Sequence, residues 1–321
     1  MTDEEKEVEI LSKPLVFFDS TDAIRGAETS EADRSATWKD FLHILKMGIV
    51  FSNLITTFAG LWLALDETGQ SFFDHIGTVI AALVGSGLVM AGGCALNNFI
   101  DRDIDQLMER TKDRPSATGQ LTARQVFWTG IIMSTLGTIV LIQASYTAAV
   151  LGLVGLFVYV VVYTLWLKRT HSINTIVGGI SGAIPPVIGW AAIDPGLVSL
   201  TPWLLFLIVF LWQPPHFLAL AIKRVDEYRR AGVPMLPVVA GMNMTKRQMI
   251  FYVVLLLPAS LMLYELGPLY LTIAVLLGIG WIAVAVAGLF TKDIMKWSKR
   301  MFVYSLNYLT ILFIVMVVSV L

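Results

Sequence analysis

The chain has 321 residues, of which 56% are hydrophobic and 15% charged, and its formal net charge is −1. A soluble protein of this size could not cover so much apolar surface with so few charges, so the composition excludes a soluble helical protein. The single cysteine, Cys94, excludes an internal disulfide, a cysteine-based metal cluster and c-type haem attachment. We therefore expect an integral membrane protein, all-α and polytopic.

Residues 1–45 differ from the rest of the chain because they are acidic and rich in Ser, Thr, Glu and Asp. They lack the basic region and short apolar core of a signal peptide, and such a composition is typical of disordered segments. We predict a disordered cytoplasmic tail over residues 1–45, followed by a membrane domain over residues 46–321.

Apolar runs predict about nine transmembrane helices in residues 46–321. They lie near 47–65, 76–99, 125–143, 147–167, 173–192, 201–222, 249–265, 268–290 and 301–320. If these helices alternate in direction, the N-terminal tail and every second connection share one side, and those segments hold all 23 Lys and Arg residues. By the positive-inside rule that side is cytoplasmic and the C-terminus lies outside.

Two long basic connections end in similar tetrapeptides, "TARQ" (Thr122 to Gln125) and "TKRQ" (Thr245 to Gln248). Both match the capping-box pattern that begins a helix, so we expect a helix to start at each. They are 123 residues apart, which indicates two related halves in the chain. The same offset carries Asp101 and Asp105 onto Arg224 and Tyr228.

The stretch "NNFIDRDIDQLMERTKDRP" follows the second apolar run and has nine charged residues among 19. If the helix continues, Asn97, Asp101 and Asp105 fall within an arc of about 80°, one turn apart, while Asp103 points the other way. Carboxylates at i and i+4 repel each other unless a cation lies between them. Oxygen ligands at this spacing suit Mg²⁺, which takes one or two carboxylates and leaves coordination sites for substrate phosphates.

Basic residues surround this acidic motif on the same side of the membrane. A metal-bound diphosphate is stabilised by both the metal ion and the side chains of Lys and Arg. The predicted diphosphate-binding residues are therefore Arg102, Lys112, Arg114, Lys168 and Arg169. The alternative is an ordinary solvated loop whose Asp and Arg residues pair at the surface. Spacing alone leaves both interpretations open.

The segment from Val177 to Trp190 in the fifth apolar run contains closely spaced glycines and the pair Pro185 and Pro186. The glycines suit close helix packing, and a proline pair breaks backbone hydrogen bonding within the membrane. We expect this helix to bend around a cavity, because broken helices at that depth need cover from protein or water.

The pattern "NNFIDRDID" resembles the first signature of the UbiA superfamily of intramembrane prenyltransferases. Three further segments, "YTLWLKRTHSINT", "WQPPHFLALAI" and "DEYRRAGVPMLPV", resemble the protoheme IX farnesyltransferase branch of that superfamily. The likeness runs from about residue 45 to the C-terminus. It implies a UbiA-type fold of nine helices around a central cavity, a Mg²⁺-dependent enzyme in the cell membrane, and farnesyl diphosphate and haem b as substrates. The implied reaction attaches the farnesyl group to a haem vinyl group with addition of water, giving haem O and diphosphate.

The resemblance also bears on the second polar loop. Superfamily members that act on aromatic acids carry a second Asp-x-x-x-Asp there, whereas this chain has Arg224 and Tyr228. Either Asp226 or Glu227 binds a second Mg²⁺, or Arg224 replaces that cation with a fixed positive charge. We favour one metal cluster on Asn97, Asp101 and Asp105, and a mixed diphosphate clamp from Arg224 with Asp226, Glu227 and Tyr228.

His216 lies in "WQPPHF" behind Pro214 and Pro215, near the depth of Asn97. An imidazole there suits contact with haem iron or a propionate, or a structural hydrogen bond to a carbonyl that the prolines free. Both interpretations stay open.

Three alternative functions are considered for this sequence. They are another UbiA-type prenyltransferase that makes a quinone or chlorophyll precursor, a transporter, and a haem-binding scaffold without turnover. Transporters usually place ion-binding carboxylates near the bilayer midplane, whereas Asp101 and Asp105 fall at its edge. The expected partners besides the substrates are the lipid bilayer and a downstream haem A synthase or terminal oxidase assembly. No nucleic acid is expected.

Overall fold

The computed structural model describes residues 36–321, and this part of the chain is built from α-helices without a β-strand. The long helices are α4 (Met47–Thr68), α5 (Ile76–Ile100), α7 (Ala123–Ala144), α8 (Tyr146–Phe157) continued by η1 (Val158–Leu167) and α9 (Lys168–Thr170), α10 (Asn174–Ala183) with α11 (Pro185–Ile193), α12 (Thr201–Lys223), α15 (Gly241–Leu261), α16 (Pro268–Ala287) and α17 (Ile294–Val318). Short helices are α3 (Trp38–Ile44), α6 (Arg102–Gln106), α13 (Val225–Arg230), α14 (Leu236–Val239) and η2 (Tyr264–Leu266).

Within residues 36–321, eight helical segments are long and apolar enough to cross a membrane, in agreement with the expected multi-pass fold. Helix α15 corresponds to the seventh predicted span, 249–265, but is not among the eight. It starts at Gly241, eight residues before the predicted apolar run, and its first turns are polar. It packs against both α12 and α16.

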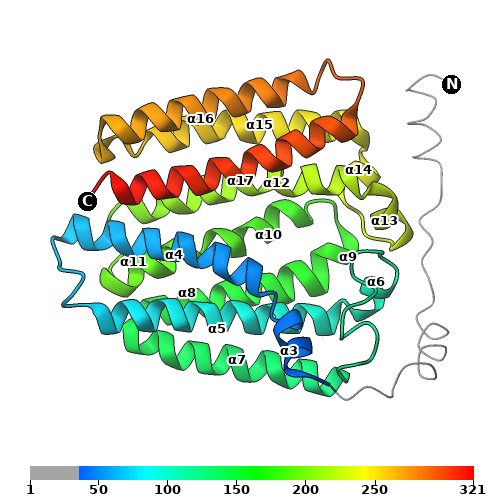
Figure 1. Cartoon of the computed structure of the whole chain (residues 1–321), viewed down its shortest axis with the longest axis horizontal. Coiled ribbons are helices and arrows are strands. Elements are labelled where there is room, and N and C mark those ends of the chain that lie inside the picture. The colour runs from blue at the N-terminus through cyan, green and yellow to red at the C-terminus, as the bar shows by residue number, and fades with distance from the viewer. Residues whose placement is uncertain (1–35) are drawn as a thin grey trace.

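The long helices lie side by side, and their ends gather at two faces of the bundle (Figure 1). One end carries α3, α6, α9 and α13, and we call it the basic end because its connections hold Lys and Arg residues. The C-terminus lies at the opposite end. Because the helices alternate in direction, two loops far apart in sequence, α6 and α13 with their flanks, meet at the basic end.

Glycines allow several of these helices to approach closely. A Cβ atom at Gly60 of α4 would lie 2.0 Å from the Pro186 carbonyl oxygen of α11, and one at Gly189 would lie 1.9 Å from that of Thr57. The α10–α11 helix is interrupted at Ile184, where Pro185 begins a new helix, as the proline pair predicted. These glycines have a packing role, because any side chain would separate the two helices.

The two predicted capping boxes have different outcomes. Thr122 caps α7, its hydroxyl accepting from the Gln125 backbone N–H at 3.2 Å, so the first prediction is confirmed. The second is wrong, because α15 starts at Gly241 and Thr245 lies inside it, donating to the Gly241 carbonyl at 2.8 Å. A capping-box sequence does not mark a helix start where the residues before it are already helical.

The predicted tail, residues 1–45, lies largely outside the described residues. Its last part is helical in the structure, because α3 begins after Thr37, whose backbone N–H donates to the Asp40 carboxylate at 2.8 Å. Helix α3 packs against α5 and leads directly into α4. The chain therefore reaches the basic end of the bundle before its first long helix.

Candidate active site at the basic end of the bundle

The first motif, which we define as Asn97, Asp101 and Asp105, faces the protein interior. Helix α5 ends at Ile100, but its hydrogen bonding continues into α6, from Asp101 N–H to Asn97 C=O at 2.9 Å and from Asp105 N–H to Asp101 C=O at 2.7 Å. The three side chains are therefore stacked and only 4%, 0% and 3% exposed. Asp103 points outward, as expected, and pairs with Arg169 at 2.7 Å.

Both buried carboxylates have basic partners from more distant parts of the chain. Lys168, the first residue of α9 directly after η1, donates to Asp101 Oδ2, which also accepts from Asn97 Nδ2 at 2.7 Å. Arg114 donates to Asp105 Oδ2 at 2.7 Å and to Asn98 Oδ1 at 3.1 Å. Buried charges are stable only when paired, so these contacts explain how two carboxylates remain in the interior.

One oxygen of the motif has no such partner. Asp101 Oδ1 is buried and accepts no hydrogen bond within the described residues, and the Arg169 guanidinium lies 3.9 Å away. Buried polar atoms nearly always have a partner, so an unsatisfied carboxylate oxygen indicates a missing ligand. A cation is the ligand that such an acceptor suits.

Lys46 belongs to this site although sequence reasoning did not select it. Its ammonium donates to Asn97 Oδ1 at 2.6 Å, and its backbone has the left-handed φ of 51° that turns the chain from α3 into α4. Burial lowers the pKa of Lys46 to about 8, and nearby Arg114 and Lys168 add to that effect. In the sequence Lys46 is only one more basic residue before an apolar run.

The π-helix η1 is a second feature that was not predicted. It places Thr164, which is fully buried, against the first motif, where its hydroxyl accepts from Asn97 Nδ2 at 3.0 Å. Tyr159 and Tyr163 of the same segment stack on each other with ring centroids 5.9 Å apart. In a segment where nearly every residue is apolar, the hydropathy pattern cannot distinguish a π-helix from an α-helix, so it could not have identified this segment.

Two residues predicted to bind diphosphate are not brought to the first motif. Arg102 is exposed and lies over the Phe99 ring, 5.1 Å from its centroid. Lys112 is also exposed and pairs with Glu109 at 2.7 Å. Arg114, Lys168 and Arg169 do reach the motif, so the structure separates the predicted basic set into an inner and an outer group.

The second motif, Asp226, Glu227 and Tyr228, lies on α13 with Arg224 just before it. Arg224 pairs with Glu227 at 3.1 Å, while the Asp226 side chain is 82% exposed and its pairing with Arg229 spans 3.5 Å. The two polar loops meet through apolar contacts of Ile104, Met108, Val233, Met235 and Val238, against which Tyr228 packs. The motifs therefore share one end of the bundle, but only the first has buried carboxylates.

His216 lies in α12, behind Pro214 and Pro215, and faces α17. Its Nδ1 is 2.7 Å from the Ser305 hydroxyl, and its ring stacks on Trp212 and Phe302 with centroids 4.4 and 4.9 Å away. Ser305 donates its own hydrogen to the Phe302 carbonyl at 2.6 Å, so it accepts from Nδ1. The hydrogen of a neutral imidazole is thereby placed on Nδ1, and the lone pair of Nε2 stays available.

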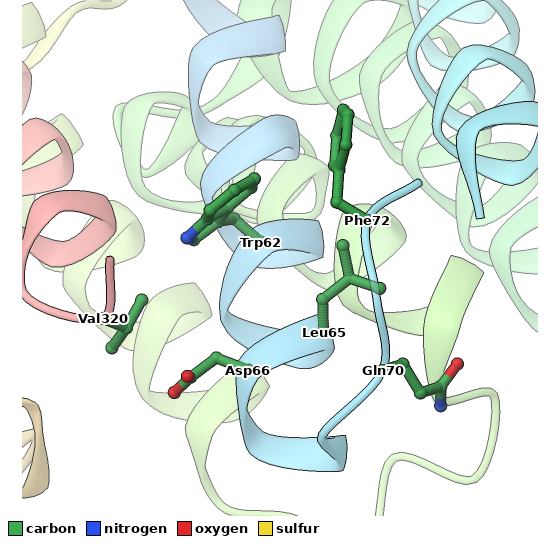
Figure 2. Close-up of a pocket in the computed structure, with 6 residues that line it drawn as sticks. All are labelled: Trp62, Leu65, Asp66, Gln70, Phe72 and Val320. Carbon is green, nitrogen blue, oxygen red and sulfur yellow. The ribbon is translucent and has the colours of Figure 1, made fainter. Parts of the chain in front are cut away.

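A pocket of about 170 Å³ lies at the other end of the bundle, where α4, the following loop and the C-terminal residues meet (Figure 2). It is lined by Trp62, Leu65, Asp66, Gln70, Phe72 and Val320. One carboxylate and no basic side chain line it, so it does not suit a diphosphate. The candidate site is therefore the first motif rather than this pocket.

Comparison with known proteins identifies the family of this chain. The model of the UbiA prenyltransferase family matches residues 53–307. A protein called protoheme IX farnesyltransferase from Alkalihalophilus pseudofirmus is 60% identical over 310 residues, covering 96% of this chain and 99% of the relative.

Solved structures share the fold at low sequence identity. A digeranylgeranylglyceryl phosphate synthase has a TM-score of 0.71 at 17% identity, covering 88% of this chain and 98% of that one. A UbiA homologue from Archaeoglobus fulgidus, solved with GPP and Mg²⁺ bound, has a TM-score of 0.57 at 14% identity, covering 86% and 99%. The chain therefore belongs to the UbiA prenyltransferase family and, within it, to the branch of the protoheme IX farnesyltransferases.

Proposed function

We propose that the protein transfers the farnesyl group of farnesyl diphosphate to a vinyl group of haem b, giving haem O and diphosphate. The observation that carries this proposal is the buried first motif with its inner group of basic residues, in a chain 60% identical to a relative named for this activity. Farnesyl C1 separates from its diphosphate oxygen and bonds to the terminal vinyl carbon. Water adds its oxygen to the adjacent carbon and releases a proton.

The side chains at the basic end suit departure of the diphosphate. Lys168 and Arg114 are held by Asp101 and Asp105, and their remaining N–H groups are available to phosphate oxygens. Preorganised cations lower the barrier because they stabilise charge as it develops, without first having to reorganise. The second motif would contribute Arg224 at the same end of the bundle.

The first motif also suits a divalent metal. Asp101 Oδ1 is a buried acceptor without a hydrogen-bond donor, and Asn97 Oδ1, which accepts from Lys46 at 2.6 Å, has a second lone pair for a metal. Asp101, Asp105 and Asn97 would hold Mg²⁺, whose hard oxygen preference matches carboxylate and amide ligands. When bound, the ion would supply positive charge to the leaving diphosphate.

We assign haem contact to His216 as part of the same proposal. The hydrogen bond to Ser305 leaves Nε2 unprotonated, which is the form that binds iron. The same bond and the stacking on Trp212 also suit a structural role. Loss of haem affinity in detergent-purified His216→Ala, with an unchanged melting temperature, supports contact; unchanged affinity with a lower melting temperature contradicts it.

By the positive-inside rule the basic end, and with it the active site, would lie at the cytoplasmic face of the cell membrane. The N-terminus would then be cytoplasmic and the C-terminus outside. The farnesyl chain of haem O is apolar and would anchor the product in the membrane, so its next acceptor would be a membrane-bound haem A synthase or terminal oxidase assembly.

Mass analysis of the haem extracted after reaction tests this proposal. Purified protein is incubated with haem b, Mg²⁺ and farnesyl diphosphate, with geranyl diphosphate as the comparison donor. We expect a product heavier than haem b by one farnesyl and one hydroxyl group. Unmodified haem together with prenylation of an added quinone precursor would contradict it and favour another prenyltransferase activity.

A further inference from the structure

The side chains beside the first motif show how its geometry is held. Asn97 has two amide hydrogens, of which one goes to Asp101 Oδ2 at 2.7 Å and the other to Thr164 Oγ1 at 3.0 Å. Its oxygen accepts from Lys46 at 2.6 Å. Every polar atom of this buried amide is therefore satisfied, and its orientation is set because Lys46 can only donate and an ionised Asp101 can only accept.

Thr164 can accept from Asn97 because its own hydrogen is used elsewhere. Its hydroxyl donates to the carbonyl of Tyr159, five residues earlier, at 2.8 Å. In a π-helix hydrogen bonds join residues five apart, so η1 brings this carbonyl beside residue 164. The hydroxyl orientation is thereby fixed, with a lone pair directed at Asn97.

The two segments run in the same direction with a constant register. Thr164 contacts Asn97 and Lys168 contacts Asp101, and both pairs are 67 residues apart in the sequence. Asn97 and Asp101 are one turn apart on their helix, as are Thr164 and Lys168 on theirs. The Thr164 contact therefore sets the level at which η1 presents Lys168 to the carboxylate.

We infer that Thr164 is a positioning residue of the active site: through Asn97, its hydroxyl holds the Asp101 carboxylate in the orientation that binds the metal. This inference rests on the proposed function. Thr164 is fully buried, and its hydroxyl contacts the Asn97 amide and the Tyr159 carbonyl. Its role is to accept one amide hydrogen of Asn97. Without this acceptor, that hydrogen could bond to another group, including Asp101 Oδ1, the oxygen that the metal needs.

The test uses isosteric substitution and a readout other than turnover. Thr164→Val keeps the shape of the side chain but removes the acceptor, whereas Thr164→Ser keeps the hydroxyl. Thr245→Val is the matched control, since Thr245 is equally buried and its hydroxyl bonds only within its own helix at 2.8 Å. Binding of Mn²⁺ to detergent-purified full-length protein, with a non-hydrolysable farnesyl diphosphate analogue, is followed by electron paramagnetic resonance.

We expect the Mn²⁺ dissociation constant to rise about tenfold in Thr164→Val and to stay within about twofold of wild type in Thr164→Ser and Thr245→Val. In an Asn97→Ala background Thr164→Val should add nothing, because it acts through Asn97. If Thr164→Val is not recovered folded, Thr164→Ala removes the same acceptor without a β-branch.

Unchanged Mn²⁺ affinity in the folded Thr164 variants, or an equal loss in the Asn97→Ala background, overturns the inference. The wild-type protein separates this outcome from failure of the proposed function. If wild type binds no Mn²⁺ with the analogue, the metal assignment itself is wrong. If wild type binds Mn²⁺ and Thr164→Val binds it equally well, only the role of Thr164 is wrong.

Discussion

The two acidic motifs meet at one end of the bundle, yet they use their charges differently. Asp101 and Asp105 are buried, and their partners Lys168 and Arg114 come from outside their own helix turn. Asp226 is exposed, and its partner Arg229 is three residues away on the same short helix. Local pairs in water contribute little, whereas buried charges persist only where structure or ligand supports them. Burial therefore separates the two motifs, and it is the reason for proposing the first motif as the reactive one.

Removal of the Asp101 charge should have the largest effect. Asp101→Asn keeps the shape of the side chain but loses the charge that faces Lys168, and we expect turnover to fall by about a thousandfold. Product formation is measured by mass spectrometry on protein of verified monodispersity. Asp103→Asn is the control, since Asp103 is 52% exposed and points outward. Equal activity losses in both variants would contradict the distinction between buried and exposed carboxylates.

Arg114 ranks next because it joins Asp105 to Asn98. Arg114→Ala should lower kcat/KM for farnesyl diphosphate by about a hundredfold, since it removes a fixed cation from the departing charge. Arg114→Lys retains the positive charge but cannot contact Asp105 and Asn98 together, so its kcat/KM should lie between those of wild type and Arg114→Ala. A variant with unchanged kinetics would place Arg114 outside the diphosphate site.

Arg224 tests whether the second motif binds diphosphate at all. It is partly buried and paired with Glu227, so Arg224→Ala should raise KM for farnesyl diphosphate about tenfold and change kcat little. Steady-state kinetics at saturating Mg²⁺ measure both parameters. A fall in kcat without a change in KM would instead assign Arg224 to the chemical step.

Asp226 should matter least. Its carboxylate is 82% exposed, so Asp226→Asn should leave turnover within about twofold of wild type and the melting temperature nearly unchanged. Loss of activity comparable to that of Asp101→Asn would show that Asp226 holds a second metal, and would remove the contrast between the motifs.

Local rules were enough to predict most of the first motif and the long helices. Hydropathy depends on short windows, and the stacking of Asn97, Asp101 and Asp105 follows from helical geometry. The capping pattern at Thr245 failed because a local signal was overridden by a helix that begins at Gly241. Helix α3 was missed because its residues were grouped with the acidic tail by composition.

Residues from other helices could not be found in this way. Lys46 lies 51 residues from Asn97, and Thr164 lies 67 residues from it. Their roles depend on how α4 and η1 pack against α5, and on a π-helix that no hydropathy period reveals. The same limit applies to Arg102 and Lys112, which share the loop of Arg114 but face solvent. Sequence spacing selects candidate residues, while packing decides which of them meet.

The position of a bound metal tests the account most directly. Crystals of the full-length protein with Mn²⁺ and a non-hydrolysable farnesyl diphosphate analogue would locate the ion by anomalous scattering. The account predicts a peak within bonding distance of Asp101 Oδ1, with the diphosphate between it and Lys168. A peak held only by Asp226 and Glu227, with no metal at Asp101 Oδ1, would contradict it.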